Sequence, residues 1–202
     1  MRDGLRVILI GGTSNIGKST VARHIAQRLG WEELSTDRLG RYPGRPWATP
    51  PDVVKPHVVE HYLTHDAPAL VLGQLEHYRN MWPKVEEAVR AHLLDDSSPL
   101  VLEGSGVWPD NVAALGLPAV AAVWLTGSPE LIAARIRRES RYEEADEQGR
   151  LLIDRFVMRS QGYDIEMRAA LQKYGLPLIE VTPDTTVEAL GGACLETMRP
   201  LG

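Results

Sequence analysis

The chain has 202 residues and a formal net charge of −5, because 27 acidic residues outnumber 22 lysines and arginines. Its hydrophobic fraction of 44% and charged fraction of 24% are ordinary for a soluble globular protein, which argues against disordered, collagen-like and membrane-embedded chains. The length is typical of one domain with a core of its own. Because no excess of basic residues is present to neutralise phosphates, nucleic acid is not expected as a partner.

Cysteine content and hydropathy narrow the class of protein further. The only cysteine, Cys194, excludes an intrachain disulfide and a multi-cysteine zinc site. The apolar run at residues 7–10 is too short for a signal peptide, and the longest apolar stretch, residues 119–125, is far short of a bilayer span. We therefore expect a cytoplasmic protein with no membrane partner. The sequence gives no indication of its oligomeric state.

Short apolar runs alternate with helical stretches, which is the pattern of an α/β fold with a parallel sheet. The predicted strands are residues 7–10, 33–36, 100–102, 120–125 and 178–181. The predicted helices are residues 18–29, 56–64, 69–81, 83–94, 129–141, 152–174 and 185–198. Loops are expected at residues 40–56, which carry five prolines, and at the acidic stretch 142–150, which we expect to be mobile. Five strands separated by helices predict a three-layer α/β sandwich.

One motif is far more specific than the rest of the sequence. The pattern G-x-x-x-x-G-K-[ST] of a phosphate-binding loop is matched by Gly12-Thr13-Ser14-Asn15-Ile16-Gly17-Lys18-Ser19. Glycines let the backbone curl until successive N–H groups point at phosphate oxygens, and the helix that follows presents the positive end of its dipole. Lys18 is expected to reach the β- and γ-phosphates, and the hydroxyl of Ser19 is expected to ligate Mg²⁺.

The segment from Ile10 to Thr20 resembles the loop of small P-loop kinases, a group that includes shikimate, gluconate and nucleoside monophosphate kinases. It is also similar to 2-phosphoglycerate-kinase-like and chloramphenicol-phosphotransferase-like members, whose loops open with Gly-Gly-Ser/Thr-Ser. The resemblance implies strand order 2-3-1-4-5, the cofactors ATP and Mg²⁺, an acceptor-binding insertion at about residues 38–98 and a lid at about residues 138–155. The nucleotide-binding residues that it implies are Gly12, Thr13, Ser14, Asn15, Ile16, Gly17, Lys18, Ser19, Thr20, Arg135 and Arg138.

Two acidic residues stand at predicted strand ends, which is where ligands bind in open parallel sheets. Asp37 follows the second strand, and small P-loop kinases carry a comparable aspartate there, which accepts or orients the proton of the attacking hydroxyl. Glu103 ends the third strand, where a Walker-B carboxylate stands near the water shell of Mg²⁺. The alternatives are a helix cap for Asp37 and an ordinary strand-end acid for Glu103.

Arginines cluster around the predicted lid: Arg135, Arg138, Arg141 and Arg150. The first three are spaced by three residues and follow a slowly turning stripe of the predicted helix. The resemblance implies one arginine against the adenine and others on the transferring phosphate, and a planar guanidinium suits both roles. We expect Arg138 and Arg141 to be catalytic. The alternative is a solvated face that pairs with nearby glutamates. Weaker candidates for the same role are Arg155 and Arg159.

The segment after Asp37 is the candidate wall of an acceptor pocket. It reads Arg41-Tyr42-Pro43-Gly44-Arg45-Pro46-Trp47, which is rigid, aromatic and doubly cationic. Two arginines there favour an anionic acceptor such as a carboxylate or a phosphate ester. The alternative is a surface loop pinned by packing of its tryptophan. The residues expected to bind the acceptor are Asp37, Arg41, Arg45, Trp47, Arg79, Glu103 and Trp108.

Three histidines, His57, His61 and His65, are spaced by four residues and share a helix face if that helix continues. Three such imidazoles are able to bind a metal, but no acid or cysteine at ligand spacing completes the site. We therefore expect a solvated histidine face rather than a zinc site.

These features favour an ATP-dependent kinase that transfers the γ-phosphoryl group to a hydroxyl or phosphate of a small, anionic metabolite, with Lys18 and Asp37 in catalytic roles. A nucleoside monophosphate kinase is the nearest alternative. A P-loop ATPase or switch that acts on a protein partner is another, although the Asn-Lys-x-Asp tetrapeptide of GTPases is absent. A third is a nucleotide-binding module without turnover, against which the intact set of acidic and basic residues argues.

Overall fold

The computed structural model describes residues 4–40, 42–48, 53–94 and 96–201. A parallel sheet lies at its centre, with β1 (Val7–Gly12) in the middle and the order β2-β3-β1-β4-β5. The strands on either side of β1 are β3 (Leu100–Glu103) and β4 (Val120–Thr126). The edge strands of this order are β2 (Glu32–Ser35) and β5 (Leu178–Glu180). This confirms the α/β class and the order 2-3-1-4-5. A two-residue strand, β6 (Arg199–Pro200), adds an antiparallel pairing to β4 that was not expected.

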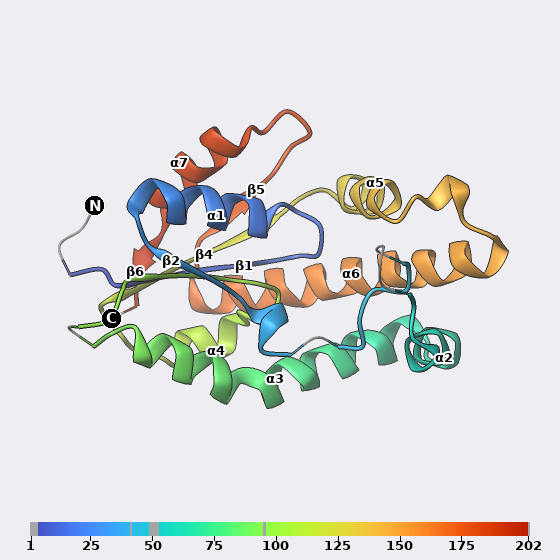
Figure 1. The fold of residues 1–202 in the computed structure, drawn as a ribbon, viewed down its shortest axis with the longest axis horizontal. Helices are drawn as coiled ribbons and strands as arrows, with labels where there is room; N and C mark the ends of the chain where they lie inside the picture. Colours follow the sequence, from blue (N-terminus) through green and yellow to red (C-terminus); the bar gives the residue numbers. More distant parts are fainter. Residues whose placement is uncertain (1–3, 41, 49–52, 95, 202) are drawn as a thin grey trace.

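Helices cover both faces of the sheet and make three layers (Figure 1). On one face lie α1 (Lys18–Leu29) and α7 (Val187–Thr197). On the other lie α3 (Ala67–Ala91), α4 (Pro109–Ala113) and α6 (Glu147–Tyr174). Beyond the carboxyl ends of the strands lie α2 (Pro56–Thr64), α5 (Pro129–Glu139) and the first half of α6. Two short 3₁₀ helices, η1 (Thr36–Arg38) and η2 (Tyr142–Glu144), complete the fold.

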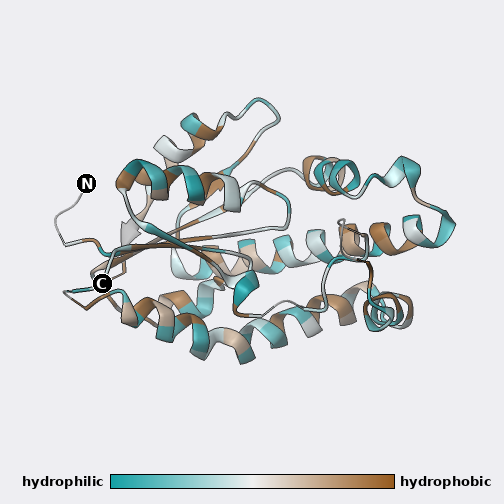
Figure 2. Cartoon of the chain, viewed as in Figure 1, coloured by the Kyte–Doolittle hydropathy of each residue, from teal (hydrophilic) through white to brown (hydrophobic). Residues whose placement is uncertain are grey.

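The core has two parts because side chains alternate along each strand. In β1, Ile8 and Ile10 pack with the helices of one face, whereas Val7 and Leu9 pack with those of the other. All six residues of β1 are buried. Apolar residues therefore gather along the central strands, while the end that carries η2 is mostly hydrophilic (Figure 2). No helix of the described residues combines the length and apolar character that a membrane span needs.

The two helices predicted at residues 69–81 and 83–94 are wrong as separate elements, because α3 runs unbroken from Ala67 to Ala91 through Pro83. A proline inside a helix removes one backbone hydrogen bond and costs stability. Met81 before this proline, and Val85 and Val89 after it, are buried in the core and hold the helix in place. Burial of this apolar face outweighs the local cost.

The mobile loop predicted at residues 142–150 is also wrong, because η2 and the first turn of α6 occupy most of it. Asp146 caps α6 and accepts a hydrogen bond from the N–H of Gly149 at 2.7 Å. Asp154 accepts from Arg137 and from the hydroxyl of Tyr142, both at 2.8 Å. The cap is local, but the contacts of Asp154 join α6 to α5 and η2, so charge and glycine content alone did not indicate them.

The helices α2 and α3 fall within residues 38–98, the segment predicted to be an acceptor-binding insertion. The predicted lid, residues 138–155, contains the end of α5, η2 and the start of α6. The roles of both segments stay predictions.

A buried carboxylate ties α6 to the ends of three strands. Asp164 is 6% exposed and accepts hydrogen bonds from the hydroxyls of Thr13, at 2.6 Å, and Thr126. Its other oxygen accepts from Nε of Arg168 at 2.7 Å, and Arg168 also donates to Glu180 at 3.0 Å. Thr13 follows β1, Thr126 ends β4 and Glu180 ends β5, so this network fixes the edge of the sheet where the phosphate-binding motif begins.

We predict that Asp164→Ala lowers the free energy of unfolding by about 2–3 kcal/mol, because two buried hydroxyls and a partly buried guanidinium lose their acceptor. Chemical denaturation with a two-state fit measures the change. Glu180→Ala is the matched control, since Glu180 pairs with the same arginine but is exposed. A loss no larger than that of Glu180→Ala would show that the network does not stabilise the fold.

Candidate functional site

The phosphate-binding motif forms a loop between β1 and α1 whose backbone needs glycine at two points. Gly12 has φ +135, and a Cβ there would lie 2.1 Å from the carbonyl oxygen of Leu125. Gly17 has φ 106 and caps α1 in the left-handed conformation. Asn15 also has a positive φ, 60°, a conformation that asparagine tolerates better than most residues. The sequence therefore folds here into the curled loop that the motif predicts.

This loop forms the floor of a cavity of about 480 Å³. The motif residues that line it are Ser14, Asn15, Ile16, Gly17, Lys18, Ser19 and Thr20. Gly12 and Thr13 lie behind the cavity, and the carbonyl oxygen of Thr13 accepts a hydrogen bond from Nζ of Lys18 at 2.6 Å. The open N-terminus of α1 at this floor is a site for an anion.

Lys18 is buried, with 8% of its surface exposed. Burial lowers the pKa of its ammonium group, and the nearby carboxylates of Glu103 and Asp37 oppose that shift. A polyphosphate in the loop would add negative charge and raise this pKa again, because an opposite charge favours the protonated form. The lysine is thus placed to bind an anion.

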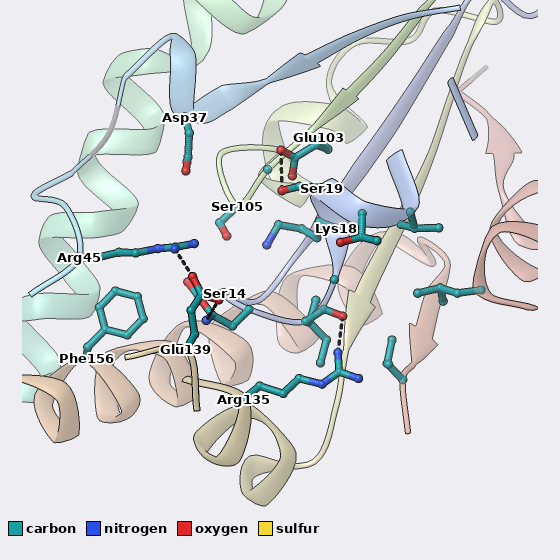
Figure 3. A pocket seen from close by; sticks show the side chains of 18 of the residues that line it. Ser14, Lys18, Ser19, Asp37, Arg45, Glu103, Ser105, Arg135, Glu139 and Phe156 are labelled. Carbon is teal, nitrogen blue, oxygen red and sulfur yellow. Dashed lines mark hydrogen bonds and ion pairs between the residues drawn. The ribbon is translucent and has the colours of Figure 1, made fainter. Parts of the chain in front are cut away.

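Ser19 and Glu103 meet beside the lysine, as Figure 3 shows. The hydroxyl of Ser19 donates to Oε1 of Glu103 at 3.0 Å, and Glu103 is 2% exposed at the end of β3. A hydroxyl and a carboxylate are hard oxygen donors, the kind that Mg²⁺ takes in phosphate sites. The pair therefore fits a magnesium ion held by the hydroxyl directly and by the carboxylate through water.

Asp37 lies in η1 and lines the same cavity, with its carboxyl group turned toward it (Figure 3). The side chain of Ser35 caps η1 and accepts from the N–H of Asp37 at 3.3 Å. Capping is therefore the role of Ser35, and the alternative of Asp37 as the helix cap is wrong. The charges of Asp37 and Lys18 act on each other across the cavity.

The lid arginines divide into two pairs. Arg135 and Arg138 line the cavity, and Arg135 donates from Nη1 to the carbonyl oxygen of Ile16 at 2.9 Å. Arg141 and Arg150 do not line it. The side chain of Arg141 is 73% exposed and lies 3.8 Å from Glu144, while Arg150 donates to backbone carbonyls of η2. The structure thus brings only the first pair to the phosphate loop.

The predicted acceptor residues also divide. Arg45 lines the cavity and forms an ion pair with Glu139. Trp47 is buried in the core, edge-on to Phe156 at 4.8 Å between ring centroids, so the packing alternative describes it better. Two further predicted residues do not line the cavity: Arg79 is exposed on α3, and Trp108 packs against Tyr163. Arg41 lies outside the described residues.

Arg159 of α6, which the sequence indicated only as a weaker candidate for binding, lines the cavity. It is 4% exposed, and its guanidinium carbon lies 4.3 Å from the ring centroid of Phe156. Its Nη1 donates to the carbonyl oxygen of Tyr42 at 3.4 Å, but its Nε has no partner, and no carboxylate of the described residues pairs with it. A signal existed, because Arg159 interrupts the apolar helix face of Phe156 and Tyr163.

The cavity is aromatic as well as cationic. Tyr42, which belongs to the predicted pocket wall, lines it together with Ser105. Other lining residues that the sequence did not indicate are Tyr78, Glu139 and Phe156. Burial raises the pKa of Tyr78, so its hydroxyl stays protonated and is able to donate.

Within the described part of the chain, no group of three or more histidine, cysteine or acidic residues is arranged to hold a metal ion, and this includes the three spaced histidines His57, His61 and His65.

No protein-family model matches this sequence, and neither does any curated protein. Several solved structures are similar over nearly the whole chain. A gluconokinase from Sinorhizobium meliloti 1021 superposes with a TM-score of 0.52 and 17% identity, covering 96% of this chain and 92% of its own. A shikimate kinase from Aquifex aeolicus vf5 gives 0.51 and 16%, covering 94% of each chain. A deoxyadenosine kinase from M. mycoides gives 0.50 and 16%, covering 94% and 97%. The chain therefore has the fold of the small P-loop kinases.

Proposed function

We propose that this protein is a cytoplasmic, ATP-dependent kinase that transfers the γ-phosphoryl group to a hydroxyl or phosphate of a small anionic metabolite. One observation carries the proposal: a single cavity is lined by the phosphate loop with Lys18, by Asp37 and by the buried Arg159. Transfer between two small molecules requires that both bind in one cavity.

On the donor side, the loop amides and Lys18 bind the polyphosphate, and Arg138 lies where it can neutralise charge on the transferred group. Arg135 already contacts the loop and is the candidate to cover the adenine. Ser19 and Glu103 would hold Mg²⁺, which supplies positive charge to the phosphate oxygens. Most of the rate then comes from position and electrostatics rather than from covalent chemistry of the protein.

On the acceptor side, Asp37 accepts or orients the proton of the attacking hydroxyl, a role that its place at the cavity supports. Arg159 supports an anionic acceptor, because a buried guanidinium with an unpartnered Nε is costly unless an anion reaches it. Arg45 adds a second cation on the same wall. The aromatic rings of Tyr42, Tyr78 and Phe156 keep a nucleoside monophosphate as the alternative acceptor.

We predict that Lys18→Ala abolishes the stabilisation of the protein by a non-hydrolysable ATP analogue with Mg²⁺. A ligand at 100 times its dissociation constant stabilises the folded state by about 2.7 kcal/mol, which thermal unfolding detects readily. Lys84→Ala removes the same charge from an exposed position on α3 and should keep the full shift. An equal shift in the Lys18 and Lys84 variants would count against the phosphate-loop assignment.

We expect Asp37→Asn to retain nucleotide affinity but to reduce turnover by about two orders of magnitude or more, the usual effect of losing a general base. The variant keeps the shape of the side chain and removes its proton affinity. Steady-state kinetics with an accepted substrate, together with nucleotide titration, separates the two effects. Near-normal turnover would reassign Asp37 to a structural role.

We predict that carboxylates or phosphate esters, nucleoside monophosphates included, stabilise the protein in the presence of the ATP analogue, and that Arg159→Met weakens this binding about ten-fold or more. Arg155→Met is the matched control: Arg155 is on the same helix, but its guanidinium bonds to carbonyl oxygens near the end of α2 and does not line the cavity. A response only to uncharged alcohols, or equal binding by both variants, would refute the anionic acceptor.

A further inference from the structure

Glu139, the last residue of α5, bridges the two walls of the cavity. Its Oε2 accepts a hydrogen bond from Nδ2 of Asn15 at 2.6 Å, and its Oε1 forms an ion pair with the guanidinium of Arg45. Figure 3 shows Glu139 facing Arg45 beside the phosphate loop. Asn15 belongs to the donor wall and Arg45 to the acceptor wall, so one carboxylate holds both sites in their present positions.

The carboxylate stands where a bound polyphosphate would repel it. Glu139 lines the same cavity as Lys18 and bonds to Asn15, a residue of the loop that takes the phosphates in the proposed function. Like charges at close range repel each other, and because Glu139 is partly exposed, water screens this repulsion in part. A polyphosphate bound in the loop therefore disfavours Glu139 in its present position.

The ion pair is also weak enough to be exchanged. The side chain of Glu139 is 44% exposed and that of Arg45 is 36% exposed, so water screens their attraction. Glu139 is the last helical residue of α5, and among the described residues its carboxylate is held by two side-chain contacts alone, from Asn15 and Arg45. By contrast, Arg159 is held between aromatic rings and is not released in this way.

We propose that Glu139 is an electrostatic latch: it holds Arg45 while the phosphate loop is empty, and a bound polyphosphate displaces it and releases Arg45 to the acceptor anion. This proposal rests on the proposed kinase function, since it takes a polyphosphate as the ligand of the loop. Arg45 is bound to Glu139 without a polyphosphate in the loop and is available to the acceptor when a polyphosphate is bound. Binding of the nucleotide therefore raises the affinity for the acceptor, and binding of the acceptor raises the affinity for the nucleotide equally.

The first test is a titration of wild type, Glu139→Gln and Glu143→Gln with a non-hydrolysable ATP analogue and Mg²⁺, which needs no acceptor. The latch predicts that Glu139→Gln binds the analogue about three- to five-fold more tightly, the effect of one partly screened charge. Glu143→Gln removes the same charge from an exposed position in η2 that does not line the cavity, and should bind like wild type. The gain for Glu139→Gln should shrink at high salt.

Equal affinities of wild type and Glu139→Gln, or an equal gain in both variants, would overturn the latch while leaving the kinase proposal intact. Failure of wild type itself to bind the analogue would instead refute the kinase proposal, and the latch with it. The two failures are therefore distinguishable. Thermal unfolding of each variant without ligand checks that the change at Glu139 has not altered the fold.

The second test follows the release of Arg45 through its reaction with phenylglyoxal, quantified by mass spectrometry of the modified peptide. In wild type, the ATP analogue with Mg²⁺ should raise the reactivity of Arg45 about two-fold or more. In Glu139→Gln, Arg45 should be reactive with and without the analogue. Arg23, an exposed arginine of α1 outside the cavity, is the internal reference. An unchanged or reduced reactivity of Arg45 in wild type would overturn the release.

Discussion

The curled phosphate loop depends on the buried carboxylate of Asp164, which joins the ends of β1 and β4 to α6 and, through Arg168, to the end of β5. A loop with positive φ values at its glycines does not hold its shape by local preference alone. The hydrogen bond from Thr13 fixes its first turn, and the close approach of Gly12 to Leu125 excludes a side chain at that point. The loop at the floor of the cavity is thus tied to the sheet edge beneath it by buried hydrogen bonds.

Five cationic side chains of the described residues line the cavity: Lys18, Arg45, Arg135, Arg138 and Arg159. The acids Asp37 and Glu103 line it too, and they oppose the effect of burial on the pKa of Lys18. Cations gathered in one cavity reduce the repulsion between negatively charged molecules, which transfer from a nucleotide to an anionic acceptor in the proposed kinase would require.

The predicted lid is held by contacts between its own helices. Asp154 of α6 binds Arg137 of α5 and Tyr142 of η2, and the guanidinium of Arg137 also lies over the ring of Tyr142. Glu139, one turn from these contacts, is left to interact with the cavity. The end of α5, which carries cavity residues, is therefore anchored to α6 and η2.

Much of the fold and the donor site followed from the sequence because the signals are local. Periodic apolar residues predicted the strands and most helices, and the spacing of glycines before Lys18 predicted the loop that now lines the cavity. The strand order came from resemblance to a family and not from periodicity. The continuity of α3 through Pro83 and the ordered lid were missed, because burial and cross-helix contacts outweigh local preference there.

The acceptor side was decided only by tertiary structure. Arginine is the same residue at positions 79, 141 and 159, yet Arg79 and Arg141 lie outside the cavity and Arg159 is buried at its wall. Trp47 was expected to bind a ligand and instead packs in the core. Composition and spacing tell which groups a chain carries, whereas the burial and partners of a charged side chain depend on residues far away in the sequence. The sequence by itself thus determined the curled loop of the phosphate-binding motif, because its signal is local, and only the packing of α6 against the sheet determined that Arg159 is buried at the cavity.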